Sequence, residues 1–262
     1  MRDCPVRFYK YRDLSGSGLG FVERTILHNE IYLPSPPTFN DPFDCLPDFD
    51  MRSTLEDRVE SYKRALTRLR PDLNQTEQAR LAHHIAKSPV VNPESDEARL
   101  TMQRLHDEQV RNNIGVYCVS ERPDSLLMWS HYAESHSGLC LEFDSSAIPF
   151  AIAQPVVYQK ARRPVGRATE SDEQSMEKAL LTKSDDWDYE EEWRVIEYQL
   201  GSGIYEIPND ALTGVILGAR ISNDHEQEIL RWLQHRLPRI PAYRSIPSDS
   251  EFRVRIEPLS KT

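Results

Sequence analysis

The chain has 262 residues, and its 32 lysine and arginine residues against 42 aspartate and glutamate residues give a formal net charge of −10. This balance lacks the overall basic surface of a typical duplex-DNA-binding protein, although it leaves room for a local basic patch. No apolar run approaches the ~20 residues of a membrane-spanning helix, and 4 tryptophans, 11 tyrosines and 8 phenylalanines argue against a disordered chain. We therefore expect one large or two small globular domains and no membrane partner.

The first residues and the cysteines indicate the compartment. The segment that begins the chain, residues 1–4, has no apolar stretch behind a basic end, so the sequence shows no signal peptide. The four cysteines, Cys4, Cys45, Cys118 and Cys140, are far apart and form no CxxC pair. We expect free thiols, with Cys118 and Cys140 in the core of strands, and a cytoplasmic localisation.

The first 45 residues predict a strand, a short helix and an unusual loop. Aromatic and β-branched residues favour a strand over 6–12, and an amphipathic pattern favours a helix over 21–29. The loop over 39–45 reads Phe-Asn-Asp-Pro-Phe-Asp-Cys. We expect its two phenylalanines to hold it on the core. A plain turn in which Asn40 and Asp41 satisfy their own backbone is equally consistent with the pattern.

Residues 52–113 differ in composition from their flanks. Charged residues dominate, apolar residues recur at helical spacing, and prolines divide the segment into two or three helices. We interpret it as a helical insertion in a single domain that spans residues 1–262. Its apolar stripe is narrow, and we expect the stripe to pack on the rest of the protein.

Beyond residue 113, strands outnumber helices. The patterns predict strands over 114–120, 138–143, 155–158, 192–198, 204–207, 215–218 and 252–256, helices over 125–134, 176–184 and 225–234, and a loop over 160–177. Because strands and helices do not alternate regularly, the predicted fold class is α+β and not a doubly wound sheet. The chain contains neither GxGxxG nor GxxxxGK[ST], so the sequence gives no support for a Rossmann nucleotide site or a P-loop.

The helix predicted in the middle of the chain carries a cluster of aromatic and titratable residues. Met128 and Tyr132 share one helical face, which favours core packing, with His131 as a satisfied polar residue. A zinc site of His131, Glu134 and His136 is disfavoured, because the i, i+3, i+5 spacing does not place two ligands on one face. We therefore expect no metal.

A second cluster, residues 187–194, reads Trp-Asp-Tyr-Glu-Glu-Glu-Trp-Arg. Three adjacent carboxylates should repel one another and raise one another's pKa. In a strand that begins just before them, Glu190, Glu192 and Arg194 share one face and Glu191 lies on the other. Such an edge fits a catalytic role. The alternative is an exposed strand start with an ordinary Glu–Arg pair, which does not explain the aromatic neighbours.

These clusters together resemble a bacterial family of uncharacterised proteins, the domain of unknown function 2971 family. The matching stretches are Phe8-Tyr9-Lys10-Tyr11-Arg12, Phe39-Asn40-Asp41-Pro42-Phe43-Asp44, Met128-Trp129-Ser130-His131-Tyr132-Ala133 and Trp187-x-Tyr189-Glu190-x-Glu192-Trp193-Arg194. The resemblance indicates kinship and implies no established reaction.

The order of elements more distantly resembles the ADP-ribosyltransferase fold, which uses NAD. That fold has an opening strand with an aromatic and then a basic residue, a middle strand that ends in a small hydroxyl residue, an aromatic residue on the next helix, and a late strand that starts with Glu-x-Glu. The positions that fit here are Tyr9, Lys10, Ser120, Tyr132, Glu190 and Glu192. The resemblance implies a compact ADP-ribosyltransferase-like β core with flanking helices.

The activity implied by this resemblance is cleavage of the nicotinamide–ribose bond of NAD, as a co-substrate, without a metal. The transition state is oxocarbenium-like, so Glu192 would stabilise positive charge and Glu190 would be the second catalytic residue, as a base toward the acceptor. The NAD-binding residues implied are Lys10, Arg12 and Arg194 for the pyrophosphate, Tyr9 and Tyr132 for nicotinamide, Ser120 beside Glu192, and Asn40 and His131 as further contacts.

The acceptor of ADP-ribose in this hypothesis is a protein, a nucleic acid or water. The resemblance implies a role as a toxin or in phage defence, together with a partner protein of such a system. Two other classes stay open. One is a non-catalytic module that binds a nucleotide or nucleic acid in the same pocket. The other is a metal-dependent hydrolase that uses Asp41, Asp44, His131 and Glu192.

Overall fold

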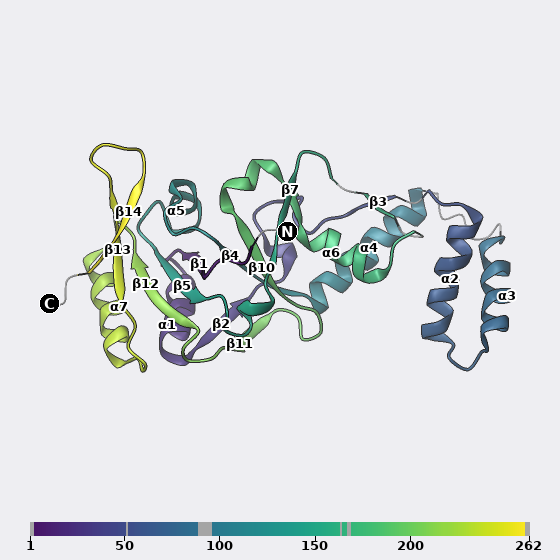
Figure 1. Cartoon of the computed structure of the whole chain (residues 1–262), viewed down its shortest axis with the longest axis horizontal. Helices are drawn as coiled ribbons and strands as arrows, with labels where there is room; N and C mark the ends of the chain where they lie inside the picture. The colour runs from purple at the N-terminus through teal and green to yellow at the C-terminus, as the bar shows by residue number, and fades with distance from the viewer. Residues whose placement is uncertain (1–2, 51, 89–95, 163, 167–168, 260–262) are drawn as a thin grey trace.

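The computed structural model describes residues 3–50, 52–88, 96–162, 164–166 and 169–259. The fold is mixed α+β, as predicted, and is built on an eight-stranded sheet in the order β14–β13–β12–β5–β1–β4–β10–β6 (Figure 1). The strands of this sheet are β1 (Arg7–Arg12), β4 (Gly115–Ser120), β5 (Leu139–Asp144), β6 (Gln154–Pro155), β10 (Glu192–Glu197), β12 (Leu212–Leu217), β13 (Ala242–Pro247) and β14 (Val254–Pro258). Within this sheet β12 and β13 are parallel, and its other described pairs are antiparallel.

The largest core lies between one face of the sheet and the helices α1 (Gly18–His28) and α7 (Asn223–His235). Alternation along each strand sends every second side chain into this core. Phe8 of β1 and Trp193 of β10 meet there, with ring centroids 5.4 Å apart, and both are buried. Val22 and Ile26 cover them from α1.

A smaller core on the opposite face is organised by α5 (Leu126–Tyr132). Trp129 is fully buried, its indole donates to the carbonyl of Pro123 at 2.8 Å, and its ring meets Tyr11 edge-on at 5.2 Å. The Ser125 hydroxyl caps the helix by accepting from the Met128 N–H. α5 therefore fixes the position of Tyr132 over the sheet.

Three short strand pairs flank the sheet. β2 (Glu30–Leu33) pairs with β11 (Gly203–Glu206), β3 (Asp48–Asp50) is parallel to β8 (Pro164–Gly166), and β7 (Val157–Gln159) is parallel to β9 (Thr182–Ser184). Short 3₁₀ turns are η1 (Pro36–Thr38), η2 (Phe150–Ile152) and η3 (Asp185–Glu190). The β7–β9 register places Lys183 beside Tyr158, next to the start of β10.

The described part of the region interpreted as an insertion contains the helices α2 (Leu55–Leu69), α3 (Gln75–Ala86) and α4 (Asp96–Asn113). Capping boxes begin α2 and α3. These two helices pack against each other, and Figure 1 shows the hairpin standing away from the sheet. The expectation that the apolar stripe packs on the rest of the protein is therefore wrong for α2. It holds for α4, where Val110 is buried beside Leu180.

Local capping and turn geometry explain where the remaining predictions differ. The predicted loop over 160–177 contains β8 and the start of α6 (Asp172–Leu181), because Ser171 and Gln174 form a capping box earlier than expected. The sequence does not predict β13, because its alternation is weak, Pro241 precedes it and Pro247 is its last residue. The last strand begins at Val254 and not at Phe252, which is fully exposed.

The cysteines are free, as expected, and Cys118 and Cys140 lie in β4 and β5. Cys140 is fully buried, and Cys118 is half-buried. None of the helices in the described part of the chain combines the length and apolar character needed to cross a membrane.

The approach of β5 to β1 depends on Gly138. A Cβ built at this residue would lie 2.1 Å from the carbonyl oxygen of Arg12, whereas a Cβ at Gly20 in α1 would meet nothing within 4 Å. We expect Gly138→Ala to lower the free energy of unfolding by about 2 kcal/mol, because the strands must separate to relieve the overlap. Gly20→Ala should leave it unchanged or raise it, since alanine favours helix. Urea unfolding of both variants tests this, and equal stability would contradict it.

Candidate active site

Three adjacent strands bring sequence-predicted residues into one row. In the sheet, Tyr9 of β1 pairs with Ser120 of β4, and Ser120 pairs with Glu192 of β10. Residues opposite each other on neighbouring strands have close Cβ atoms on the same face. Positions 9, 120 and 192, which are far apart in the sequence, are therefore direct neighbours.

A cavity of about 440 Å³ opens beside this row. In the described register, β1 pairs with β4 at Tyr9 alone, whereas it pairs with β5 along its whole length. The Lys10 Nζ donates to the Cys118 carbonyl at 2.7 Å and so satisfies a β4 acceptor that β1 leaves open. The lining residues used below are Tyr9, Lys10, Arg12, Asn40, Asp44, Ser120, His131, Tyr132, Lys183, Glu190 and Glu192. Of the residues predicted for the NAD site, Arg194 does not line this cavity, and neither does Asp41 of the hydrolase alternative.

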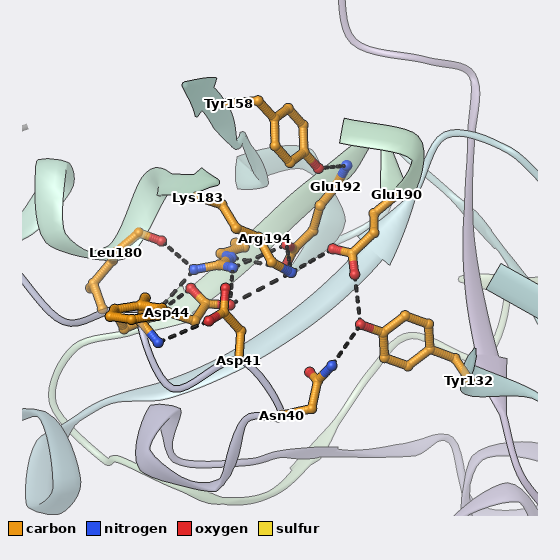
Figure 2. Close-up of polar contacts among 12 residues, drawn as sticks. Asn40, Asp41, Asp44, Tyr132, Tyr158, Leu180, Lys183, Glu190, Glu192 and Arg194 are labelled. Carbon is orange, nitrogen blue, oxygen red and sulfur yellow. Dashed lines mark hydrogen bonds and ion pairs between the residues drawn. The ribbon is translucent and has the colours of Figure 1, made fainter. Parts of the chain in front are cut away.

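Arg194 lies behind Glu192 and organises a buried cluster of charges (Figure 2). Its guanidinium donates through Nε and Nη2 to the two oxygens of Glu192 at 2.8 and 3.0 Å, and through Nη2 to Asp44 at 2.8 Å. Its Nη1 donates to the Leu180 carbonyl at 2.6 Å. Arg194 is 0% exposed, so its charge depends on these partners.

Lys183 joins the two glutamates of the cluster. Its Nζ lies 2.5 Å from Glu190 Oε2, 3.1 Å from Glu192 Oε2 and 3.6 Å from Asp44 Oδ2. Burial disfavours its charge, yet Glu192, Glu190 and Asp44 raise the pKa of Lys183 well above its ordinary value. The ammonium therefore stays charged between the carboxylates.

The two glutamates of the cluster differ in pKa. Burial opposes ionisation of Glu192, but Arg194 and Lys183 hold its pKa well below the ordinary value. Burial raises the pKa of Glu190, and the Lys183 ion pair offsets this effect only in part. The prediction that the carboxylates raise one another's pKa is therefore wrong for Glu192, because it overlooked the two cations. Glu191 points away and lies 3.4 Å from Arg122.

Backbone geometry explains this separation. The strand begins only at Glu192, since Glu190 ends the 3₁₀ turn η3 and Glu191 has φ 45°, in the left-handed region. This turn brings Glu190 to the same side as Glu192. The Tyr158 hydroxyl accepts from the Glu192 N–H at 2.8 Å and holds the start of β10. The cluster is buried, so an exposed Glu–Arg pair does not describe it.

Tyr132 connects Glu190 to the opposite wall of the cavity. Its hydroxyl donates to Glu190 Oε1 at 2.6 Å and accepts from Asn40 Nδ2 at 3.3 Å, as Figure 2 shows. Burial and then the Glu190 charge raise the pKa of Tyr132. The hydroxyl therefore acts as a fixed donor to the glutamate.

Two cations lie on the β1 side of the cavity. Burial, and then the neighbouring Arg12, lower the pKa of Lys10 to about 8. The Lys10 ammonium lies 5.0 Å and the Arg12 guanidinium 5.8 Å from the Tyr117 ring centroid, within cation–π range. This wall could hold an anionic group.

The loop over 39–45 combines both interpretations drawn from its sequence. Asp41 makes a plain turn, with Oδ1 accepting from the Phe43 N–H at 2.8 Å, whereas Asp44 ion-pairs with Arg194. Phe39 packs on the core as expected. Phe43 is 61% exposed, so the expectation that both rings hold the loop on the core is wrong for Phe43.

Ser120 and His131 line the cavity without the contacts expected of them. The Ser120 hydroxyl accepts from the Arg122 N–H at 3.2 Å, and its link to Glu192 is the backbone pairing. His131 is exposed beside Tyr189, so it is not a satisfied core residue. Across the described ranges, no three His, Cys, Asp or Glu side chains are grouped so that they could hold a metal ion.

Sequence reasoning missed Lys183 and Tyr158. The sequence predicts Lys183 within a helix over 176–184, and no local pattern distinguishes it from the other lysines of this polar segment as a site residue. The sequence predicts Tyr158 as a strand residue but gives no sign of its hydrogen bond to the Glu192 backbone. Their roles arise from the parallel β7–β9 pair, which joins segments more than twenty residues apart.

Comparison with protein families links part of the chain to a described family. Residues 128–195 match the family described as "Protein of unknown function (DUF2971)". This match supports the first of the two resemblances. It covers about a quarter of the chain, including Tyr132, Lys183, Glu190, Glu192 and Arg194. No curated protein and no solved structure matches the chain.

Two bidentate arginine–carboxylate pairs, one buried and one exposed, test how burial changes the contribution of such a pair to stability. Arg194 donates two hydrogen bonds to Glu192 and is fully buried. Arg52 also donates two side-chain hydrogen bonds to Asp50, but the Arg52 side chain is 86% exposed. We expect Arg194→Met to lower the free energy of unfolding by about 3–5 kcal/mol, because Glu192 and Asp44 lose a buried partner. Arg52→Met should remain close to the wild type. Equal losses in urea unfolding would show that burial does not matter here.

Proposed function

We propose that this chain is an NAD-consuming enzyme that cleaves the nicotinamide–ribose bond and passes ADP-ribose to an acceptor. The observation that carries the proposal is the row of Tyr9, Ser120 and Glu192 beside one cavity, with Glu190 next to it. The resemblance to the ADP-ribosyltransferase fold assigns these positions to one site. A volume of about 440 Å³ lies within the range of small-molecule sites.

The electrostatics of the cluster suit a reaction that develops positive charge. Three carboxylates, those of Asp44, Glu190 and Glu192, face two cations, Lys183 and Arg194. The cluster is neutral when Glu190 is protonated and carries one negative charge when Glu190 is ionised. A preorganised negative charge beside the ribose would stabilise an oxocarbenium-like transition state.

We assign the two glutamates different roles. Glu192 is held ionised and immobile by Arg194, so it supplies fixed charge. Glu190 has a raised pKa and is held by one hydroxyl and one ammonium, so its proton can exchange. A carboxyl group of this kind suits a general base that takes the proton of the acceptor.

The opposite wall supports binding of the anionic part of NAD. Lys10 and Arg12 provide two cations in a chain whose net charge is −10. Charge-assisted hydrogen bonds from such side chains would hold a pyrophosphate. Tyr9 and Tyr132, also on the lining, offer aromatic rings for nicotinamide.

Nicotinamide release from NAD, measured with and without cell lysate, tests the reaction. We expect Glu190→Gln to lower kcat by at least about 100-fold, because the exchanging base is lost. Glu191→Gln is the matched control, since this carboxylate points away to Arg122, and it should keep wild-type activity. The proposal is refuted if the wild-type protein releases no nicotinamide from NAD, either alone or mixed with lysate. NAD binding without release would indicate the non-catalytic module instead.

The pH dependence of kcat/KM should be bell-shaped. Activity should rise above the ordinary glutamate pKa of 4.5, as Glu190 with its raised pKa loses its proton. It should fall above about pH 8, because Lys10 then loses the charge that binds pyrophosphate. Lys10→Arg keeps its charge at these values and should move the falling limb to higher pH. If the falling limb of the kcat/KM profile stays at the same pH in this variant, the loss of activity at high pH comes from a group other than Lys10.

A further inference from the structure

A second cavity, of about 320 Å³, adjoins the site on the far side of Lys183, which lines both cavities. Its lining includes Phe43, Gln159, Lys160, Arg162 and Trp187. None of these five residues is used in the proposed cleavage of NAD. A group bound here would lie next to the Lys183 ammonium, which is 2.5 Å from Glu190.

The walls of this second cavity offer aromatic faces and cations together. Phe43 is 61% exposed, and the Arg162 guanidinium lies 5.8 Å from its ring centroid. Trp187 lies 5.1 Å from the Lys183 ammonium. Four cations and three carboxylates line this cavity, and because Lys178 and Lys183 are paired with Glu170 and Glu190, Lys160 and Arg162 are the cations that could meet an anionic ligand. Exposed rings beside cations are the elements with which proteins bind single-stranded nucleic acid.

Gln159 adds a hydrogen-bonding group to this cavity. Its Nε2 is buried and, among the described residues, finds no hydrogen-bond partner. A buried amide donor without a partner costs free energy unless a ligand or water satisfies it. The edge of a nucleobase carries acceptors that suit such a donor.

A line of aromatic rings leads from the second cavity to the first. Trp187 lies 6.1 Å from Tyr189, which lies 6.1 Å from His131, which lies 6.4 Å from Tyr132. Trp187 lines the second cavity, and His131 and Tyr132 line the first. Successive bases of a strand could stack along this path, because every base has an aromatic face.

We infer that the second cavity binds one nucleotide of a single-stranded nucleic acid, and that a neighbouring base of the same strand, reaching the first cavity beside Glu190, is the acceptor of ADP-ribose. This inference rests on the proposed function. In the transfer, the bond between the nicotinamide nitrogen and ribose C1′ breaks, and nicotinamide leaves as a neutral molecule with the bonding pair. A base nitrogen forms the new bond to C1′ and loses its proton to the Glu190 carboxylate. The acceptor gains ADP-ribose, and no oxidant or metal takes part.

Binding of fluorescent single-stranded DNA tests the inference without any turnover. The probes are decamers of dA, dC, dG and dT, measured by fluorescence anisotropy at low salt with the full-length protein. We expect Phe43→Ala to weaken binding of the preferred decamer about tenfold, because a stacking face is lost. Lys160→Ala should weaken binding and reduce its salt dependence, since a phosphate contact is lost.

Two control variants lie far from the cavity. Phe252 is fully exposed near β14, and Arg239 is exposed after α7, so Phe252→Ala and Arg239→Ala should bind as the wild type does. Binding that is absent for all four decamers, or equal in Phe43→Ala and Phe252→Ala, would overturn the inference. Transfer of ADP-ribose from labelled NAD to lysate proteins but to none of the decamers would also overturn it. Because binding is measured without NAD, failure of nicotinamide release leaves this test intact.

Discussion

The Arg194 guanidinium is hydrogen-bonded to three segments that are far apart in the sequence or end at different elements. It contacts Asp44 in the loop after η1, Glu192 in its own strand and the Leu180 carbonyl at the end of α6. A fully buried arginine is unfavourable unless its donors are satisfied, and these three partners satisfy them. The positions of the loop, of β9 and of the η3 turn follow from this requirement, and with them the position of Lys183.

The same cluster gives different environments to two carboxylates, Glu190 and Glu192, that are separated by one residue. Glu192 is in the β10 ladder and shares its face with Arg194, so it is held on both oxygens. Glu190 precedes the left-handed residue Glu191 and reaches the cluster from a turn, so it meets Lys183 and Tyr132 instead. The left-handed conformation of Glu191 thus places Glu190 and Glu192 among different partners, which raises the pKa of Glu190 and lowers that of Glu192.

The sequence predicts the elements that depend on local pattern, such as β1, α1, β4, β5 and α7, and it locates Glu190, Glu192 and Tyr132 near one another. The sequence does not predict positions that are determined by a contact between distant segments. Lys183 becomes a site residue through the β7–β9 pair, and no local pattern marks that pair. The sequence predicts Phe43 on the core, but its ring is exposed and lies 5.8 Å from the guanidinium of Arg162 in a distant segment. The pKa of Glu192 depends on a lysine nine residues away along the chain.

The single register pair between β1 and β4 has a mechanical consequence. The strands from β14 to β1 and those from β4 to β6 are each held by continuous ladders, but few backbone hydrogen bonds cross from β1 to β4 in the described structure. Sliding or opening one half-sheet against the other therefore breaks little regular structure. Side chains such as Lys10, and the core contact of Phe8 with Trp193, join the two half-sheets, and Tyr9 and Ser120 form the described register pair between them.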